Sequence, residues 1–262
     1  MIKSAYSELK TGVSVSLNWP IGAIATPGFG RKGLVHKVMS FVDTPLSAHG
    51  YDDEVEFNTQ CSSQWDSLCH FHHQESQSGY NGVKTSVAEL TQNYGEEDKE
   101  QKLPTLNHWH SRGGLVARGV FIDFKRWADE NGRSFNPYTD DKITVEDIEA
   151  VAKKQGVEFK VGDVIIIRSG FTEGLTGQTP EKQGELMGSH KVCGVTGNEA
   201  TAKWFWNKHC RFLDPLLLFS QFLRRMECSL HWHVLELRSH RRSAFHNTWT
   251  GERQIARHPS GS

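Results

Sequence analysis

The sequence lacks any long hydrophobic run and any excess of charge of one sign. Its longest apolar stretch, near residues 213–222, is interrupted and falls well short of the roughly 18 residues that suggest a membrane span. The 30 lysines and arginines balance 31 acidic residues, so the formal net charge is −1 and the pI is about 6.9. This balance argues against a nucleic acid or a membrane surface as partner.

Cysteine is also scarce, and its spacing is not that of a disulfide framework or a zinc module. The chain has an odd number, five: Cys61, Cys69, Cys193, Cys210 and Cys228. The N-terminal residues show neither the apolar core of a signal peptide nor the Arg-rich, acid-free pattern of a transit peptide. These absences favour a reducing, cytoplasmic compartment. Cys61 and Cys69 flank Asp66; we favour small buried residues over nucleophiles, because neither belongs to a Cys–His–carboxylate signature.

What the sequence does contain is an alternation of strand and helix patterns. Residues 115–124 and 162–171 include β-branched and aliphatic runs typical of buried strands. Between them a helix pattern begins at Thr144, with Asp147 placed as in a capping box, and ends at Gly156. A strand, a capped helix and a second strand predict an α/β fold with a covered sheet.

Other segments give weaker signals. Ser86 with Glu89, and Thr196 with Glu199, have the spacing of further helix starts. Two polar segments predict irregular connections: 92–102 and 125–141.

The character of the chain changes from about residue 210. Beyond it there is no lysine, and the last 25 or so residues show no sustained period of 2 or 3.6. Upstream, periodicity and turn residues agree with one fold, whereas in these last residues they do not. We therefore divide the chain into a domain over residues 1–209 and a divergent tail over residues 210–262, whose reading frame we expect to be shifted after about Leu237.

Segment 58–74, NTQCSSQWDSLCHFHHQ, concentrates the chemistry of the chain. Gln60, Gln64, Asp66 and His70 recur at even spacing, so an extended backbone would turn all four to one side. Asp66 is the only anion before the histidines, and an imidazole can move a proton at neutral pH. A carboxylate that holds metal ions, backed by a histidine, activates water for attack on a carbonyl. A hydrogen-bonded loop is the alternative, and spacing alone does not separate the two.

The same segment resembles the signature of the cyclase-like metal-dependent hydrolase family, which includes bacterial kynurenine formamidases and isatin hydrolases. The family pattern H-x-G-T-H-x-D-x-P-x-H-F stands here as QCSSQWDSLCHF over residues 60–71. Further similarity, closest to the fungal branch, covers roughly residues 10–209 and includes VSLNWP (15–20), PGFGRKGLVHKV (27–38), ARGVFIDFKRWADENG (117–132) and GVTGNEATAKWFWNKH (194–209). The resemblance implies a single domain of the swivelling β/β/α type.

The resemblance also implies roles for the matching residues. Asp66 takes the position of an aspartate that bridges two divalent ions, zinc or manganese. His70 takes that of a histidine that donates and accepts the proton beside the metal. Gln60 and Gln64 stand where the family has two histidine ligands. Because an amide oxygen is a poorer ligand than imidazole, we expect reduced metal affinity.

The family completes its site with a histidine and then a glutamate near the C-terminus. SLHWHVLEL (229–237) resembles the histidine segment, which makes His231 the candidate ligand. The segment expected next is replaced by RSHRRSAFHNTWTGER. Without the second carboxylate, a dinuclear centre is not expected.

Other histidines have a functional and a structural interpretation. His72 and His73 point in different directions in either regular structure. The pairs in the HWH segments at 108–110 and 231–233 would each share a face on a strand and could form a zinc-binding module. Surface or hydrogen-bonded histidines are favoured, because each pair lacks a nearby third ligand.

Three residues are candidates for substrate contact. Trp65 and Phe71 are expected to wall the pocket. Arg168, in IIIRSG, matches a strand-end arginine of the family. It is either a bidentate ligand for a substrate carboxylate or part of a structural ion pair.

Together these features predict a hydrolase of an amide or cyclic amide C–N bond. The most specific substrate prediction is an aryl formamide such as N-formylkynurenine, which belongs to the breakdown of tryptophan. Asp66 and His70 would activate water for a small-molecule substrate. The alternative is a catalytically silent homologue that binds a ligand or partner in the same pocket. The family commonly forms homo-oligomers.

Overall fold

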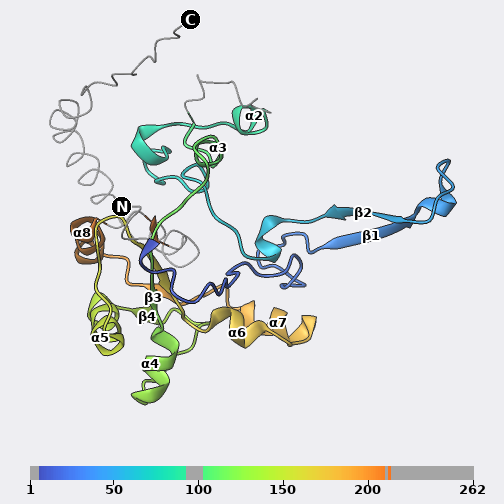
Figure 1. The fold of residues 1–262 in the computed structure, drawn as a ribbon. Coiled ribbons are helices and arrows are strands. Elements are labelled where there is room, and N and C mark those ends of the chain that lie inside the picture. Colours follow the sequence, from blue (N-terminus) through green and yellow to red (C-terminus); the bar gives the residue numbers. More distant parts are fainter. Residues whose placement is uncertain (1–5, 93–102, 210–211, 214–262) are drawn as a thin grey trace, which may run out of the picture.

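The computed structural model describes residues 6–92, 103–209 and 212–213. Helices and strands are mixed along this part of the chain, and a long two-stranded hairpin extends away from the body that holds most other elements (Figure 1). None of the helices described is long and apolar enough to cross a membrane. Most of the predicted 92–102 loop and of the tail, including His231, lies outside the described residues.

A parallel sheet of three strands forms the centre of the body, in the order β3-β5-β7. Strand β3 pairs with β5 from Gly119 opposite Val164 to Ile122 opposite Ile167. Every second residue of both strands is buried, as the predicted strands require. The three strands are β3 (Gly119–Ile122), β5 (Val164–Ile167) and β7 (Phe212–Leu213). A helix begins soon after β3 and β5, which makes both shorter than predicted.

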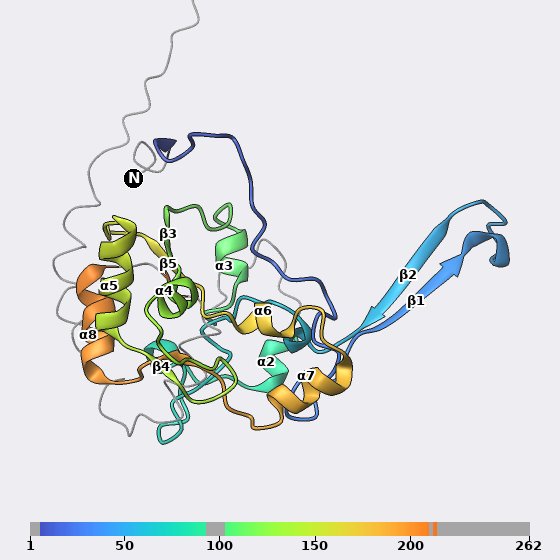
Figure 2. The same cartoon turned by 90° about the horizontal axis from the view of Figure 1, so that it is seen from below.

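Helices cover this sheet and bury its apolar side chains. They are α4 (Phe124–Glu130), α5 (Val145–Gln155) and α8 (Glu199–Lys208), of which α5 and α8 lie side by side (Figures 1 and 2). The core draws on all three helices and on both longer strands, and its fully buried members include Ile122, Phe124, Ile148 and Ile165. Burying one such side chain contributes about 2 kcal/mol, so this core is the main source of stability of the body.

Helix α5 confirms the predicted capping box. The Thr144 side chain accepts from the Asp147 N–H, and the Asp147 carboxylate accepts from the Thr144 N–H in return. Gly156 ends the helix with φ of +66°, a left-handed conformation that glycine adopts at little cost. A second predicted capping box, Ser86 with Glu89, is also present, but α2 (Val87–Leu90) is a single exposed turn.

Two predictions about the helical parts of the chain were wrong. Residues 125–141 are not wholly irregular, because Asp123 caps α4 by accepting from the Arg126 N–H. Helix α8 starts after Asn198, which accepts from the Thr201 N–H. Thr196, the predicted cap, instead donates its N–H to the Ile143 carbonyl. At α8 the Asn198 cap lies closer to the helix than the predicted Thr196 cap, and at α4 the Asp123 cap begins a helix where none was predicted.

The remaining elements of the body join its N-terminal segment to the second half of the chain. The Gln183 amide, on α7, accepts from the Ala25 N–H and donates to the Ala23 carbonyl. Ile24 packs with Tyr138 and Leu175 in a second small core. The elements are β4 (Lys142–Ile143), β6 (Gly194–Val195), α6 (Phe171–Leu175), α7 (Pro180–Met187), α3 (Asn107–His110), η2 (Thr59–Cys61) and η3 (Tyr80–Gly82).

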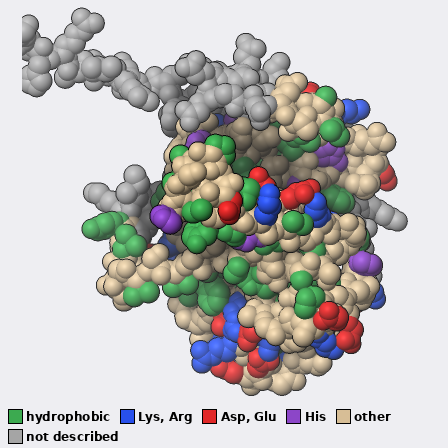
Figure 3. All heavy atoms as spheres, turned by 90° about the vertical axis from the view of Figure 1, so that its right-hand side faces the viewer, with side chains coloured by type: hydrophobic (Ala, Val, Ile, Leu, Met, Phe, Trp, Pro, Cys, Tyr) green, Lys and Arg blue, Asp and Glu red, His purple; other side chains and the backbone are tan. Residues whose placement is uncertain are grey.

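The hairpin consists of β1 (Val35–Ser40) and β2 (Tyr51–Glu56), joined through η1 (Phe41–Asp43). The strands pair antiparallel from Val35 opposite Glu56 to Ser40 opposite Tyr51. Nearly all of its residues are exposed. On the side of the molecule toward which the hairpin points, hydrophobic side chains are exposed among charges of both signs (Figure 3).

The two capping boxes allow a matched stability test. Thr144→Ala removes the cap of a packed helix, so we expect it to lower the free energy of unfolding by about 1 kcal/mol. Ser86→Ala removes the same motif from an exposed single turn and should cost much less. Urea unfolding followed by circular dichroism measures both. Equal losses would show that the cap of α5 adds nothing through packing.

Candidate active site

The segment that carries the predicted site is fastened to residues 19–24. The Ile24 N–H donates to the Cys61 carbonyl over 3.0 Å. The Ser62 hydroxyl donates to the Trp19 carbonyl, and the Ser63 hydroxyl accepts from the Trp19 N–H, each over 2.7 Å. These bonds fix the chain just before Gln64.

Beyond this anchor the chain borders an open hollow of about 310 Å³. Residues 63–67 have no regular structure, and residues 68–69 form a turn. The walls combine a carboxylate and an imidazole with apolar side chains from two other segments, and the lining residues are Thr59, Gln64, Trp65, Asp66, Ser67, Cys69, His70, Leu90 and Leu106. We call this the Asp66 hollow.

Asp66 and His70 lie next to each other among the residues that line this hollow. The His70 Nδ1 lies 3.8 Å from the Asp66 Oδ1; the Asp66 side chain is 14% exposed and that of His70 43%. Burial raises the pKa of Asp66, while the charges of His70 and Arg31 act in the opposite direction. The pair therefore combines a partly desolvated carboxylate with an imidazole that water can reach.

The two glutamines differ in position. Gln64 lines the hollow, and its buried Nε2 has no hydrogen-bond partner within the described part of the chain. Gln60 lies in the 3-10 turn η2, its N–H donates to the Asn58 side chain, and it does not line the hollow. The even spacing brings Gln64, Asp66 and His70 together but not Gln60, because that turn breaks the extended backbone which the pattern assumed.

The candidate aromatic walls also differ. Trp65 lines the hollow and stacks edge-on against Trp109, with ring centroids 5.5 Å apart. Phe71 is partly buried but is not among the lining residues.

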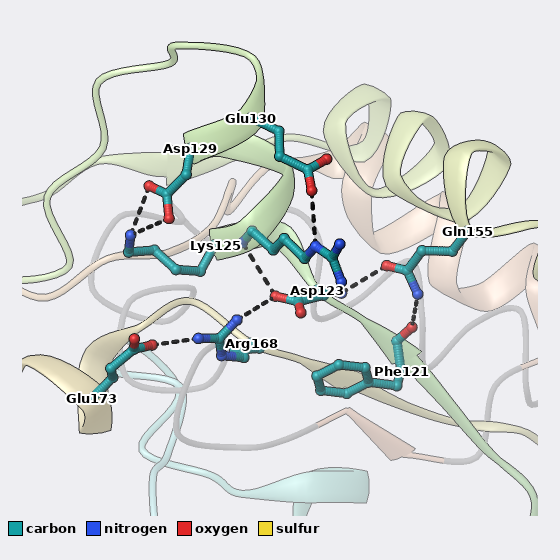
Figure 4. Close-up of polar contacts among 9 residues, drawn as sticks. Phe121, Asp123, Lys125, Asp129, Glu130, Gln155, Arg168 and Glu173 are labelled. Atoms are coloured by element: carbon teal, nitrogen blue, oxygen red, sulfur yellow. Dashed lines mark hydrogen bonds and ion pairs between the residues drawn. The ribbon is translucent and has the colours of Figure 1, made fainter.

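Arg168 lies in a structural network at the ends of β3 and β5 (Figure 4). Its guanidinium donates to Asp123 at 2.8 Å and to Glu173. Both acids neutralise its charge, and Arg168 does not line the Asp66 hollow. The geometry matches the ion-pair alternative for this residue.

Arg31 is a cation that the sequence reasoning missed. Phe29 and Gly30, with φ of +64° and +67°, turn the chain just before it. The Asn58 N–H donates to the Lys32 carbonyl over 3.1 Å, which holds this turn beside the site segment. Arg31 is partly buried, its guanidinium carbon lies 5.1 Å from the Phe29 ring centroid, and it forms no ion pair or hydrogen bond with another described residue. Its flanking glycines predict a turn, but nothing in the sequence places that turn near Asp66.

The other histidines have local partners. His72 contacts the Thr85 hydroxyl at 3.0 Å, and the buried His73 contacts the Ser76 hydroxyl at 2.9 Å. His108 and His110 lie on the helical turn α3 and not on a strand, so they do not share a face as expected. The second HWH segment lies outside the described residues.

The described cysteines behave as small buried residues. Cys61, Cys69 and Cys193 are buried, and none of them forms a disulfide bond within the described part of the chain. Cys69 reaches the hollow, but burial raises the pKa of its thiol, which disfavours the nucleophilic thiolate.

The zinc or manganese ion implied by the family resemblance requires more ligands than these residues supply. Among the described residues there is no group of three His, Cys, Asp or Glu side chains that could hold a metal. The hollow offers one carboxylate, one imidazole, the Cys69 thiol with its raised pKa, and the Gln64 amide, whose oxygen is a poorer ligand than an imidazole. Protein zinc sites use at least three protein ligands, so the described donors do not fit either ion.

Comparisons with known proteins agree with this architecture. A crystal structure of a novel cyclase matches with a TM-score of 0.62 and 22% sequence identity, over 81% of this chain and 68% of that one. At this identity the match shows the fold alone, and it confirms the predicted α/β, cyclase-like fold. No curated protein matches the chain.

The family comparison covers most of the same region. The model of the family described as "Putative cyclase" matches residues 15–213, from the segment before Trp19 to the end of β7. This range is more than half of the chain and includes every described residue of the Asp66 hollow. The chain therefore belongs to the putative cyclase family.

Proposed function

We propose that this cyclase-family protein is a hydrolase that cleaves an amide or cyclic amide C–N bond in the Asp66 hollow. The observation that carries the proposal is the Asp66–His70 pair, 3.8 Å apart at the edge of a hollow with apolar walls. A carboxylate beside an imidazole is a general acid–base pair, and the walls suit a substrate with an aromatic part.

His70 acts on the water. Its Nδ1 faces Asp66, which leaves Nε2 as the atom that takes a proton from water. The Asp66 carboxylate stabilises the imidazolium that forms. As in other oriented imidazole–carboxylate pairs, the separation should shorten when substrate excludes water, since such contacts are often loose without ligand.

Gln64 acts on the carbonyl. Gln64 lines the hollow, and its Nε2 donor is buried and lacks a partner among the described residues. Leaving such a donor unpaired costs about 1–3 kcal/mol, a cost that a substrate oxygen would remove. A rotation of the Gln64 side chain would bring this donor into the hollow, where it would stabilise the oxyanion as water adds to the carbonyl carbon.

The reaction then ends with bond cleavage. Collapse of the tetrahedral intermediate breaks the C–N bond, and the His70 imidazolium returns its proton to the departing nitrogen. Water is consumed, and a carboxylic acid and an amine are released. For an aryl formamide these products are formate and an aromatic amine.

Arg31 would select the substrate. Its guanidinium has no acidic partner among the described residues, although its charge acts on Asp66. A guanidinium that stacks on Phe29 without a close acidic partner can bind a carboxylate bidentately. We therefore propose an aryl formamide with a carboxylate, of which N-formylkynurenine is an example, with its ring on Trp65.

The central test uses Asp66→Asn, which keeps the shape of the side chain. We expect the wild type to release formate from N-formylkynurenine, and the variant to lose about 100-fold in kcat/KM, because the imidazolium loses its stabilising charge. Absorbance of the released amine measures the rate.

Asp129→Asn is the matched control, since Asp129 is an exposed acid that pairs with Lys125 on α4. Its kcat/KM should equal that of the wild type. Absence of turnover in the wild type would contradict the proposal and favour the catalytically silent homologue. Undiminished turnover in Asp66→Asn would contradict the assignment of the reaction to the Asp66 hollow.

Arg31→Gln tests the substrate class. We expect KM for N-formylkynurenine to rise about tenfold, because one charge-assisted contact is lost. KM for formanilide, which has no carboxylate, should stay unchanged. Arg168→Gln serves as the comparison and should not discriminate between the two substrates. If Arg168→Gln discriminates and Arg31→Gln does not, the carboxylate contact belongs to Arg168.

Metal binding is expected to be weak, because the described donors supply too few ligands for zinc or manganese. Protein incubated with either ion and then dialysed should retain far less than one equivalent by elemental analysis. Turnover should be the same before and after a chelator. Retention of a full equivalent, or loss of turnover on chelation, would show that residues beyond these complete a metal site.

A further inference from the structure

Two aromatic residues that are far apart in the sequence stack on each other beside Arg31. The ring centroids of Phe29 and His190 are 4.6 Å apart, and the ring planes meet at 31°. The His190 ring also borders Gly28, because a Cβ added to that glycine would lie 3.7 Å from the His190 Nδ1. We call residues 28–32 the Arg31 turn. The imidazole therefore packs against the beginning of this turn.

Both stacked residues have a backbone conformation that their side chains disfavour. Phe29 has φ of +64° and His190 has φ of +52°, in the left-handed region that residues with a Cβ rarely adopt. Such conformations persist only where the surrounding structure imposes them. The Arg31 turn is therefore not held in shape by its own preferences, and it needs a contact from another part of the chain.

The segment that carries His190 is fixed to the body of the molecule. The Ser189 hydroxyl donates to the Tyr138 carbonyl over 3.1 Å, and Tyr138 belongs to the second small core. The His190 N–H donates to the carbonyl of Met187, the last residue of α7, over 3.0 Å. His190 thus lies on a supported segment, from which its ring can hold the turn.

The far side of the Arg31 turn leads to the candidate site. The Phe29 ring centroid lies 5.1 Å from the guanidinium carbon of Arg31, a distance typical of a cation–π contact. The charge of Arg31 acts on Asp66. One phenylalanine ring therefore contacts both the imidazole and the guanidinium, and the contacts run from the body through His190 and Phe29 to Arg31.

We propose that His190 is a positioning residue for Arg31. Its ring holds Phe29 in place, and Phe29 in turn holds the guanidinium where it can meet the substrate carboxylate. His190 does not line the Asp66 hollow, so it acts through Phe29 and not on the substrate itself. This inference rests on the substrate contact proposed for Arg31, although the hold on the turn can be measured without substrate.

His190→Asn tests the hold on the turn. It removes the ring and keeps the backbone, because asparagine adopts positive φ more readily than most residues. We expect trypsin to cleave the full chain after Arg31 at least about fivefold faster in this variant, since cleavage follows the population of the opened turn. Cleavage after the exposed Arg112, just beyond α3, should stay unchanged and is the internal reference. Mass spectrometry at early times measures both.

Kinetics provide the second measurement on His190→Asn. KM for N-formylkynurenine should rise about threefold, because a smaller fraction of the protein presents Arg31 to the carboxylate. The kcat value, and KM for formanilide, should stay within about twofold of the wild type. Adding His190→Asn to Arg31→Gln should change KM by less than about twofold, because the contact that His190 supports is already lost.

Three further variants complete the test. His209→Asn is the matched control, because His209 is also exposed, has φ of +53° and ends α8. It should change neither the cleavage after Arg31 nor KM. Phe29→Asn removes the same stack from the side of the turn and should give faster cleavage even if His190→Asn folds poorly. His190→Phe restores an aromatic ring and should return cleavage and KM to near the wild-type values.

Four results would overturn the inference. They are unchanged cleavage after Arg31 in His190→Asn and Phe29→Asn, no preferential rise of KM for N-formylkynurenine, equal effects from His209→Asn, and a further threefold rise when His190→Asn is added to Arg31→Gln. If the wild type does not turn over N-formylkynurenine, the proposed function fails. Cleavage after Arg31 then decides by itself whether His190 holds the turn.

Discussion

The candidate site depends on the hydrogen bonds that fasten residues 61–63 to residues 19–24. Two of them join the serine hydroxyls of Ser62 and Ser63 to the backbone of Trp19, and one joins Cys61 to Ile24. The residues that follow have no regular secondary structure to hold them. Without this anchor, Gln64 and Asp66 would not keep a fixed position beside the hollow, because an irregular segment is ordered only by the bonds that its neighbours make.

The anchor depends in turn on a part of the chain far away in sequence. Residues 23–25 are bound by the amide of Gln183, which also donates to the Leu175 carbonyl. All three contacts are made by one side chain that is 5% exposed. A buried amide with its partners satisfied is a stable link, whereas the same amide with one partner lost would carry an unpaired polar group. The site segment is thus supported from α7 through the N-terminal segment.

The sequence predicted the central strand–helix–strand unit well, because its signals are local. The aliphatic run around Ile165 and the Thr144 capping box each specify their element without help from elsewhere. It failed at Asp123, which caps a helix that its polar surroundings had hidden, and it placed the cap of α8 at Thr196 instead of Asn198. The hairpin was missed because its strands lack a buried face and so show no clear alternation.

Within the site, sequence spacing could group Asp66 with His70 but could not place residues from other segments. Arg31 and Leu106 reach the region through tertiary folding, and no period or motif connects them with Asp66. Spacing also predicted that Gln60 lines the hollow, but the 3-10 turn η2 holds Gln60 away from the lining residues. Motifs therefore locate the chemistry along the chain, while the remainder of a pocket depends on contacts that only the folded structure supplies.

The openness of the Asp66 hollow has a consequence for reaction choice. With His70 43% exposed, solvent has direct access to the imidazole, and water is present at very high concentration compared with any dissolved amine or alcohol. Enzymes that transfer acyl groups to other acceptors keep water away from the reacting groups, whereas the described walls of this hollow leave His70 in contact with solvent before substrate binds. For the acyl transfer that we propose, solvent access of this degree favours water as the acceptor, and therefore hydrolysis.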